Sequence, residues 1–355
     1  MFDNIHILYI LSKYKLGFIS KKELIIGFRE YIINRGQIFI KIIQLFLMNQ
    51  YKWGGTFTND EFEELNKILD NVYLDIPESD FNIGCGSVAY VCYNKSDNSK
   101  VIKKLIPGIE EKIEESFDNF SSMIKMSRLF NYDIINIDEL YIYKKYMLEQ
   151  TNMIKEADSM KKMKQVFKFN KYINIPNIFF YNNEMIEMEF KKGEKIDDFL
   201  KKYPDRKKEC CKLLEEALKS MLDSKFIHGD LHPGNLLFYI KNNEVKLNMI
   251  DFGLVLELTK KQHIIFYNFL FKNNTDNNIK YIYEMSSKTI FFSDFYKICN
   301  LDKNINIFNN NSISIDGHYI IKFLKDNNIT INIKYINFLI TFYSLRSRLK
   351  RSRLK

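Results

Sequence analysis

The sequence has few residues that break or cross-link a chain: five prolines and five cysteines in 355 residues. The cysteine number is odd and no Cys-x-x-Cys pair occurs, which argues against a disulfide framework and a cysteine zinc site. Cys210 and Cys211 are adjacent, so they would point to different sides of any helix that they share. This cysteine usage is typical of a reduced, intracellular chain with unpaired thiols.

Long apolar runs are also missing. The longest candidates, Ile38 to Met48 and Tyr335 to Leu345, are about half of the ~20 residues that span a bilayer, and both contain polar residues. The N-terminal residues include Asp3 and contain no arginine before Arg29. Targeting segments are instead basic and poor in acidic residues. We therefore expect no signal peptide, transit peptide or transmembrane helix, and a cytoplasmic or peripherally membrane-associated location.

The composition is that of an ordinary folded protein, with 46% hydrophobic and 27% charged residues. The length is enough for a two-lobed core. A net charge of +9 favours anionic partners, which include nucleotides, acidic lipid surfaces and nucleic acid.

The order of local patterns predicts an α+β fold, with a small β-rich part followed by a mainly helical part. Residues 1–78 are predicted to be helical, and 81–106 to form strand, glycine turn, strand and a further strand. Further along we predict one long helix (137–167), two strands (178–181 and 185–190), a helix (205–225), a hairpin turning at Asn242-Asn243, and only helix beyond Gly253. The predicted domains are an N-terminal extension (1–78), a β-rich lobe with the long helix (79–190) and a helical lobe (191–355).

The most informative stretch is His228-Gly-Asp-Leu-His-Pro-Gly-Asn235, followed fifteen residues later by Ile250-Asp-Phe-Gly253. Asp230 and Asn235 have the spacing of a kinase catalytic loop, in which Asp is the base and Asn binds a second metal ion. Asp251 follows a buried strand and is placed to coordinate Mg²⁺. A chance turn rich in glycine and proline is the alternative, but two ordered motifs at this separation favour phosphoryl transfer.

His228 and His232 also have the i, i+4 spacing of a zinc pair on a helix. Gly229, Pro233 and Gly234 argue against a stable helix there, so we favour orientation of the loop by His228.

The turn formed by Gly84, Gly86, Ser87 and Ala89 lies between two predicted strands. Glycines let backbone N–H groups approach the phosphates of ATP, and a lysine on the next strand can reach them. Lys103 is our candidate for that lysine and Lys104 is its rival; a purely structural turn is the alternative for the glycines.

An acidic partner should come from the long helix. Glu156 is our candidate, and a plain solvated glutamate is the alternative.

Together these residues resemble the UbiB family of atypical kinases, also called the AarF-domain or ADCK group. The shared signatures are Gly36 to Gln44, the Ser87 turn, Lys103 with Pro107-Gly-Ile-Glu110, Glu156-Ala157, Met188-Glu189-Phe190, His228 to Asn235 and Ile250 to Gly253. The resemblance implies a protein-kinase-like fold with an extension over the nucleotide cleft. It also implies Mg·ATP binding, ATPase or small-molecule kinase activity, a nucleotide-binding role for Glu189, and a link to quinone or lipid metabolism at membranes.

In the extension, Lys41 and Gln44 are the only polar residues from Ile38 to Met48, and they lie on one face. Buried polar groups need partners, and the family's K-x-G-Q motif, which reaches into the active site, would explain them. The alternative is a surface helix with a snorkelling lysine.

The chain departs from the family at three points. Ile43 replaces the glycine of K-x-G-Q, and Gln150 and Asn152 replace the two acids of an E-x-D pair. The alanine-rich nucleotide loop of the family has Gly84 and Gly86 here. We interpret these changes as altered gating of an intact site.

Two further absences argue against a conventional protein kinase. No proline follows Pro233, so there is no Ala-Pro-Glu motif, and Gly229 replaces the arginine that would bind a phosphorylated loop. No acid follows Asp326, and the basic end is compatible with a solvated helix, with contact to anionic lipid and, least favoured, with nucleic acid.

Our leading hypothesis is a UbiB-like ATP-dependent phosphotransferase or ATPase acting on a small molecule or lipid-linked acceptor. The alternatives are a small-molecule kinase of the aminoglycoside or choline type and a non-catalytic, nucleotide-gated scaffold.

Overall fold

The computed structural model describes residues 9–10, 12–36, 38–42, 82–129, 137–271, 275–286 and 290–301, with 327, 329 and 335. These residues form a mixed α+β structure, which confirms the predicted class. The chain divides into two compact units, one of residues 1–93 and 103–151 and the other of 94–102 and 152–355. The predicted domain boundaries after residues 78 and 190 stay predictions. The basic C-terminal segment lies outside the described residues.

The described N-terminal residues are helical. Helix α2 (Lys21–Asn34) begins at a capping box, in which Glu23 N–H donates to Ser20 Oγ and Ser20 N–H donates to Glu23 Oε2 at 2.7 Å. Residues 38–42 form a further helical turn, where the Phe39 ring lies 5.9 Å from the Tyr31 ring and 5.3 Å from the Phe120 ring. These edge-on aromatic contacts fix the turn against its own unit.

The predicted strand, glycine turn and strand are confirmed. β1 (Asn82–Cys85) pairs antiparallel with β2 (Ala89–Asn94), and β3 (Asp97–Leu105) follows. The five-stranded sheet has the order β1-β2-β3-β6-β5, with β5 (Ile178–Tyr181) and β6 (Met185–Glu189) as the second predicted hairpin. On β3, Val101 and Lys103 are buried and the residues between and after them are not.

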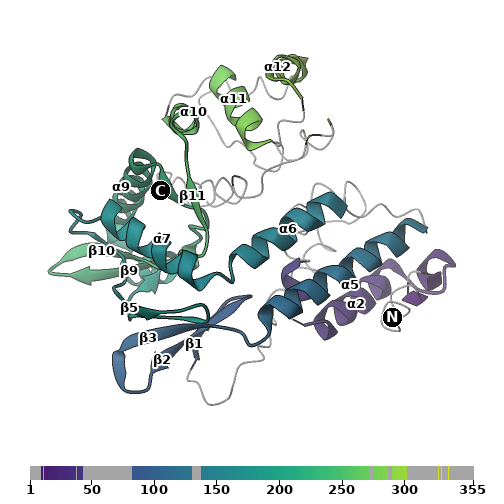
Figure 1. The fold of residues 1–355 in the computed structure, drawn as a ribbon, viewed down its shortest axis with the longest axis horizontal. Helices are drawn as coiled ribbons and strands as arrows, with labels where there is room; N and C mark the ends of the chain where they lie inside the picture. The colour runs from purple at the N-terminus through teal and green to yellow at the C-terminus, as the bar shows by residue number, and fades with distance from the viewer. Residues whose placement is uncertain are drawn as a thin grey trace. The chain divides into compact units, whose positions relative to one another are not determined.

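Helix α5 (Ile109–Leu129) was not predicted, and it lies beside α6 (Ile137–Glu149) in the same unit (Figure 1). Its buried residues Ile113, Phe117, Phe120 and Ile124 recur every three or four positions, so the helical signal was present in the sequence. Lys144 of α6 forms ion pairs with Glu114 and Asp118 of α5.

The single long helix predicted for 137–167 is wrong. The chain forms α6 and α7 (Met153–Val166), separated by Gln150, Thr151 and Asn152. Asn152 is the N-cap of α7, because its side-chain oxygen accepts the Lys155 N–H at 2.8 Å. A polar N-cap begins a new helix. The apolar residues keep their helical spacing across it, so the sequence pattern does not show the break.

The second unit contains a four-stranded sheet in the order β4-β10-β9-β7. Its strands are β4 (Ile173–Asn174), β7 (Glu194–Lys195), β9 (Leu236–Lys241) and β10 (Glu244–Met249). The predicted β9–β10 hairpin is confirmed, and Asn242 and Asn243 take the left-handed φ values of 53° and 59° that its two-residue turn requires.

The prediction of helix alone beyond Gly253 is wrong, because β11 (Val255–Glu257) is a strand. It pairs antiparallel with β8 (Phe226–His228), with Val255 opposite His228. Pairing with a segment some thirty residues earlier leaves no mark on the local pattern, so sequence periodicity does not show it.

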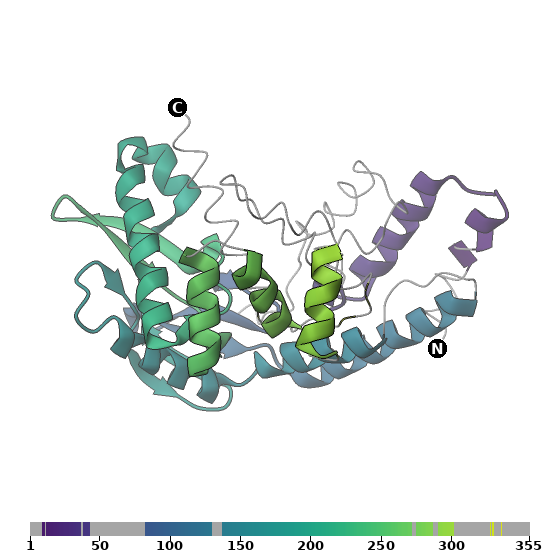
Figure 2. The same cartoon turned by 90° about the horizontal axis from the view of Figure 1, so that it is seen from above.

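Helices α8 (Ile196–Lys202), α9 (Lys207–Ser224), α10 (Lys260–Phe271), α11 (Thr275–Met285) and α12 (Phe292–Leu301) complete this unit. α10 packs beside α9 and α11, and α11 packs beside α12 (Figure 2). On α9, Cys210 is buried, which raises its pKa to about 12, whereas Cys211 is half-buried. The two cysteines thus face different sides, as predicted. Among the described residues, no helix has both the length and the apolar character of a membrane span.

Candidate functional site

The loop between β8 and β9 is organised around His228, which is fully buried. Its Nδ1 accepts the Asp230 N–H at 3.1 Å, and its Nε2 lies 3.3 Å from the Ile250 carbonyl oxygen. A neutral ring with its proton on Nε2 satisfies both contacts. Burial lowers the pKa of His228 in spite of the nearby Asp230 and Asp251 charges. Both ring nitrogens are engaged, so His228 orients the loop and is not available to a zinc ion.

Gly229 has no room for a side chain. A Cβ atom there would lie 2.8 Å from Leu254 Cγ, and the Gly229 N–H donates to the Leu254 carbonyl at 2.9 Å. In conventional protein kinases this position holds an arginine. Here Leu254 occupies the space that such a side chain would need.

The structure brings together Asp230, Asn235 and Asp251. Asn235 is buried, and its Nδ2 donates to the Asp230 carbonyl at 2.9 Å, so its Oδ1 is the atom left to meet a cation. The Ile250 N–H donates to the Asn235 carbonyl at 3.0 Å, which places Asp251 directly beside this loop. Asp251 is exposed and has a left-handed φ of 61°, a conformation that Asp and Asn tolerate better than most residues.

A carboxylate and an amide oxygen are ligands that suit Mg²⁺, which also keeps waters and phosphate oxygens in its shell. In the part of the chain that the structure describes, no group of three or more His, Cys, Asp or Glu residues could hold a metal ion alone. Asn235 and Asp251 would supply one amide oxygen and one carboxylate to such an ion.

Glu156 lies beside this group. It is 2% exposed on α7, and its Oε2 is 3.4 Å from the point where a Cβ of Gly253 would sit, while Asp251 Oδ1 is 3.5 Å from the same point. The alternative of a solvated glutamate is wrong. A Cβ atom at position 253 would make ordinary van der Waals contact with both carboxylates, so the two acids lie on the same side of Gly253.

The glycine turn belongs to the first unit. The Gly86 N–H donates to the Ala89 carbonyl at 2.8 Å; Ala89 is buried and Ser87 is half-buried. Gly84 and Gly86 are exposed and neither has a positive φ, and a Cβ on Gly84 would meet nothing within 4 Å. The fold itself therefore does not require glycine at position 84.

For two other predicted residues of this unit, Lys103 and Lys41, the structure gives the burial of the side chain. Lys103 is 8% exposed and Lys104 is half-buried, so the two neighbours differ as the alternation of a strand demands. Lys41 is half-buried at the end of the described helical turn 38–42, whereas Ile43 and Gln44 lie outside the described residues. The predicted pairing of Lys41 and Gln44 on one face stays a prediction.

The carboxylate of Glu189 is held by its own surroundings. It accepts from Lys191 Nζ at 2.5 Å, from Asn177 Nδ2 at 2.8 Å and from the Asn177 N–H at 3.2 Å. Partial burial opposes ionisation, but these hydrogen bonds outweigh it and keep the pKa of Glu189 below its usual value. Any contact of Glu189 with a nucleotide would therefore come from its backbone.

This lowered pKa predicts a pH-dependent stability difference. A carboxylate with a depressed folded pKa stabilises the protein above its unfolded value of about 4.5, and this contribution is lost as the pH falls through the folded pKa. We expect Glu189→Gln to unfold at lower denaturant than wild type at pH 7, and the difference to vanish in acid. Denaturant unfolding from pH 3 to 7 measures this, with Glu184→Gln in the exposed adjoining turn as the control. A difference that persisted unchanged at pH 3 would contradict it.

Two residues that the sequence analysis missed shape the segment after Glu189. Asn248 Nδ2 donates to the Lys192 carbonyl at 2.8 Å, and a Cβ on Gly193 would lie 2.8 Å from Leu237 Cβ. Gly193 therefore lets this segment pack directly on β9, next to the loop of residues 228–235. The only sign of this close packing in the sequence was that a glycine follows shortly after a predicted strand.

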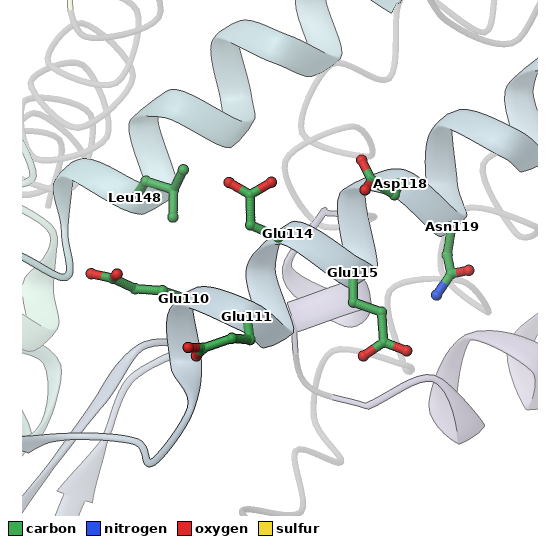
Figure 3. A pocket seen from close by; sticks show the side chains of 7 residues that line it. All are labelled: Glu110, Glu111, Glu114, Glu115, Asp118, Asn119 and Leu148. Atoms are coloured by element: carbon green, nitrogen blue, oxygen red, sulfur yellow. The ribbon is translucent and has the colours of Figure 1, made fainter.

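An acidic hollow lies elsewhere, on the first unit. A hollow of about 810 Å³ on α5 and α6 is lined by Glu110, Glu111, Glu114, Glu115, Asp118, Asn119 and Leu148 (Figure 3). Lys144 pairs with two of these acids, and Thr151 Oγ1 lies 2.8 Å from Glu110 Oε1. None of the predicted site residues lines this hollow, and two of its acids, Glu114 and Asp118, join α5 to α6 through Lys144.

Comparison with known proteins shows the family of the chain. Residues 60–286 match the family model of the ABC1 atypical kinase-like domain. The chain is 29% identical over 215 residues to "Uncharacterized protein in hydrogenase 1 5'region" of Clostridium pasteurianum, covering 57% of this chain and 39% of that one. It is 26% identical to "Probable serine/threonine-protein kinase abkC" of Dictyostelium discoideum, covering 51% of this chain and 27% of that one. It is 25% identical to "Protein ACTIVITY OF BC1 COMPLEX KINASE 3, chloroplastic" of Arabidopsis thaliana, covering 55% and 28%.

The aligned part of this chain thus spans well under half the length of these relatives. The family model, by contrast, covers more than half of this chain and includes the catalytic loop, Glu156 and the Asp-Phe-Gly segment. The chain belongs to the ABC1 family of atypical kinase-like proteins, the UbiB or ADCK group, and its fold is kinase-like.

Proposed function

We propose that the protein binds Mg·ATP and transfers or hydrolyses the γ-phosphate. The observation that supports this most strongly is the joined arrangement of Asp230, Asn235 and Asp251. The buried His228 ties the two motifs together, because its Nδ1 accepts the Asp230 N–H and its Nε2 lies within hydrogen-bond distance of the Ile250 carbonyl oxygen. A carboxylate placed to accept a proton, beside two oxygen ligands for a cation, is what phosphoryl transfer requires of a protein.

Each of these residues would have a distinct role. Asp230, whose side chain is 43% exposed, would accept the proton of the attacking hydroxyl or water. Asn235 Oδ1 and the Asp251 carboxylate would hold Mg²⁺. Bound Mg²⁺ would neutralise charge on the phosphates and align them. His228 would hold the Asp230 backbone next to the end of the segment that precedes Asp251.

The remaining predicted residues would bind the nucleotide. Lys103 would contact the α- and β-phosphates, and the turn containing Gly84, Gly86, Ser87 and Ala89 would cover them. The exposed Gly84, which the fold does not need as glycine, supports this role because a close backbone approach to phosphate is a reason to keep it. Glu156 is proposed as the acidic partner of Lys103, the Glu189 backbone as an adenine contact, and Lys41 with Gln44 as an extension that closes over the nucleotide.

For the acceptor we propose a small molecule or a lipid-linked compound in preference to a peptide. Gly229 has no space for the arginine that reads a phosphorylated activation loop, and no proline follows Pro233 to build a peptide-docking segment. The net charge of +9 and the basic C-terminal residues suit an anionic membrane surface as the place of action.

The deciding experiment is to incubate the purified chain with Mg·ATP labelled on the γ-phosphate, with and without anionic lipid vesicles. Label in a lipid or small molecule would establish a phosphotransferase, and label in inorganic phosphate an ATPase. Tight binding with no turnover would instead support the nucleotide-gated scaffold. Gln150 and Asn152, which replace the two acids of the family's E-x-D pair, favour that alternative. The intact Asp230, Asn235 and Asp251 favour an enzyme.

The strand register of Lys103 makes a separate prediction. Lys103 is buried and Lys104 is half-buried on the opposite face of β3, so only one of them can meet the phosphates. We expect Lys103→Ala to weaken Mg·ATP binding or turnover by at least about tenfold, and Lys104→Ala by less than about threefold. Calorimetric titration with Mg·ATP and steady-state ATP turnover measure both. An equal or reversed effect would show that Lys104 holds the nucleotide.

A further inference from the structure

His232, the second histidine of the catalytic loop, takes a geometry unlike that of His228. Its Nδ1 accepts the Gly234 N–H at 3.0 Å, so a neutral ring carries its proton on Nε2. That Nε2 lies 3.9 Å from Asp230 Oδ2, which is beyond hydrogen-bond distance. The His232 side chain is 50% exposed, in contrast to the buried His228. One ring nitrogen of His232 is thus engaged by the loop, and the other lies near the Asp230 carboxylate.

Gly234 fixes the His232 ring in this position. A Cβ on Gly234 would lie 2.6 Å from His232 Cε1 and 2.8 Å from His232 Nδ1, so only glycine allows the ring to lie flat against the backbone. His232 precedes the short 3₁₀ turn Pro233–Asn235 with an extended backbone, and its side chain caps that turn. The turn ends at Asn235, so the ring is positioned by the same few residues that place Asn235 and Asp230.

We propose that His232 is a further catalytic residue, which donates its Nε2–H to an oxygen of the γ-phosphoryl group during transfer. This inference rests on the proposed phosphotransfer function. In that reaction the attacking oxygen forms a bond to phosphorus and gives its proton to Asp230, and the bond from phosphorus to the β-phosphate oxygen breaks, with its electrons going to ADP. Charge on the transferring group must be stabilised beside Asp230, which is where the Nε2–H is directed.

A purely structural role would use the other ring nitrogen. If His232 only capped the turn, its function would depend on Nδ1 accepting from Gly234, and the Nε2–H would be dispensable. Two amide side chains separate these roles, because glutamine places an N–H near the position of Nε2, whereas asparagine places an oxygen near that of Nδ1 and can accept from the residue two positions on.

The test compares His232→Gln with His232→Asn in the full chain, with His263→Asn on α10 as the control for a histidine away from the loop. We expect His232→Asn to lower ATP turnover by about 100-fold, because it removes one hydrogen-bond donor to the transition state. His232→Gln should lower turnover by less than about tenfold, because it keeps that donor. Mg·ADP affinity, measured by calorimetry, should change by less than about threefold in both. Addition of aluminium fluoride, which mimics the transferring phosphoryl group, should tighten Mg·ADP binding to wild type and His232→Gln but not to His232→Asn.

Retention of turnover by His232→Asn together with its loss in His232→Gln would overturn the proposal in favour of a capping role. Equal turnover in both variants would overturn it as well. Each of these results requires an active wild-type chain. A wild-type chain that binds Mg·ATP without turnover, and that gains nothing from aluminium fluoride, would instead overturn the phosphotransfer function on which the inference rests.

Discussion

Asp251→Asn is expected to bind Mg·ATP on the order of 100-fold more weakly than wild type while unfolding at the same temperature. Residues that only support a metal ligand already cost about 10–100-fold in affinity when changed, and Asp251 is proposed as a ligand itself. The fold should persist because Asp251 is exposed and its left-handed φ of 61° is one that asparagine adopts readily. The neutral amide keeps the shape of the side chain and removes the charge that holds Mg²⁺.

Calorimetric titration with ATP in the presence and absence of Mg²⁺ measures this, and thermal unfolding checks the fold. Asp223→Asn, an exposed aspartate on α9, is the matched control and should bind like wild type. Unchanged Mg·ATP affinity in Asp251→Asn would remove Asp251 from the metal site.

Asp230→Asn is expected to separate chemistry from binding. Loss of the proton acceptor should lower turnover by about 10²–10⁴-fold, which is the usual range for general-base catalysis. Mg·ATP affinity should stay within a few-fold of wild type, since Asp230 is not proposed as a metal ligand. The loop should keep its shape, because His228 and Asn235 bind the Asp230 backbone and not its carboxylate.

The measurement is single-turnover ATP consumption at saturating nucleotide, set beside calorimetry on the same sample. The comparison with Asp251→Asn is informative, since one variant should lose turnover and the other binding. If Asp230→Asn lost affinity as strongly as Asp251→Asn, the division of roles between base and metal ligand would be wrong.

The departures of this chain from its family have a structural side as well. Asn152 stands where the family pattern has the second acid of E-x-D, and here it caps α7, the helix that carries Glu156. Aspartate is an equally good N-cap, so the helix start would tolerate the acid. The helix therefore does not need a neutral residue at position 152, and the interpretation of this change as altered gating stays a prediction.

Much of the local structure followed from the sequence alone. The hairpins β1–β2, β5–β6 and β9–β10 were predicted because their turns contain glycine or asparagine at the required positions, as at Asn242 and Asn243. The different sides taken by Cys210 and Cys211 followed from helical geometry. The two motifs of the candidate site were recognised because a catalytic loop needs fixed residue types at short fixed spacings, which chain order preserves.

Other features depended on contacts between distant segments. The pairing of β11 with β8, the packing of Leu254 on Gly229, and the burial of Glu156 beside Gly253 join residues that lie 25 to almost 100 positions apart. Local periodicity reports which face of one element is buried, but not which segment covers it. For the same reason the sequence contained both histidines of the catalytic loop, yet only the folded backbone decided their roles. The Ile250 carbonyl and the Asp230 N–H engage both nitrogens of His228, whereas the Gly234 N–H engages one nitrogen of His232 and the other lies 3.9 Å from Asp230 Oδ2.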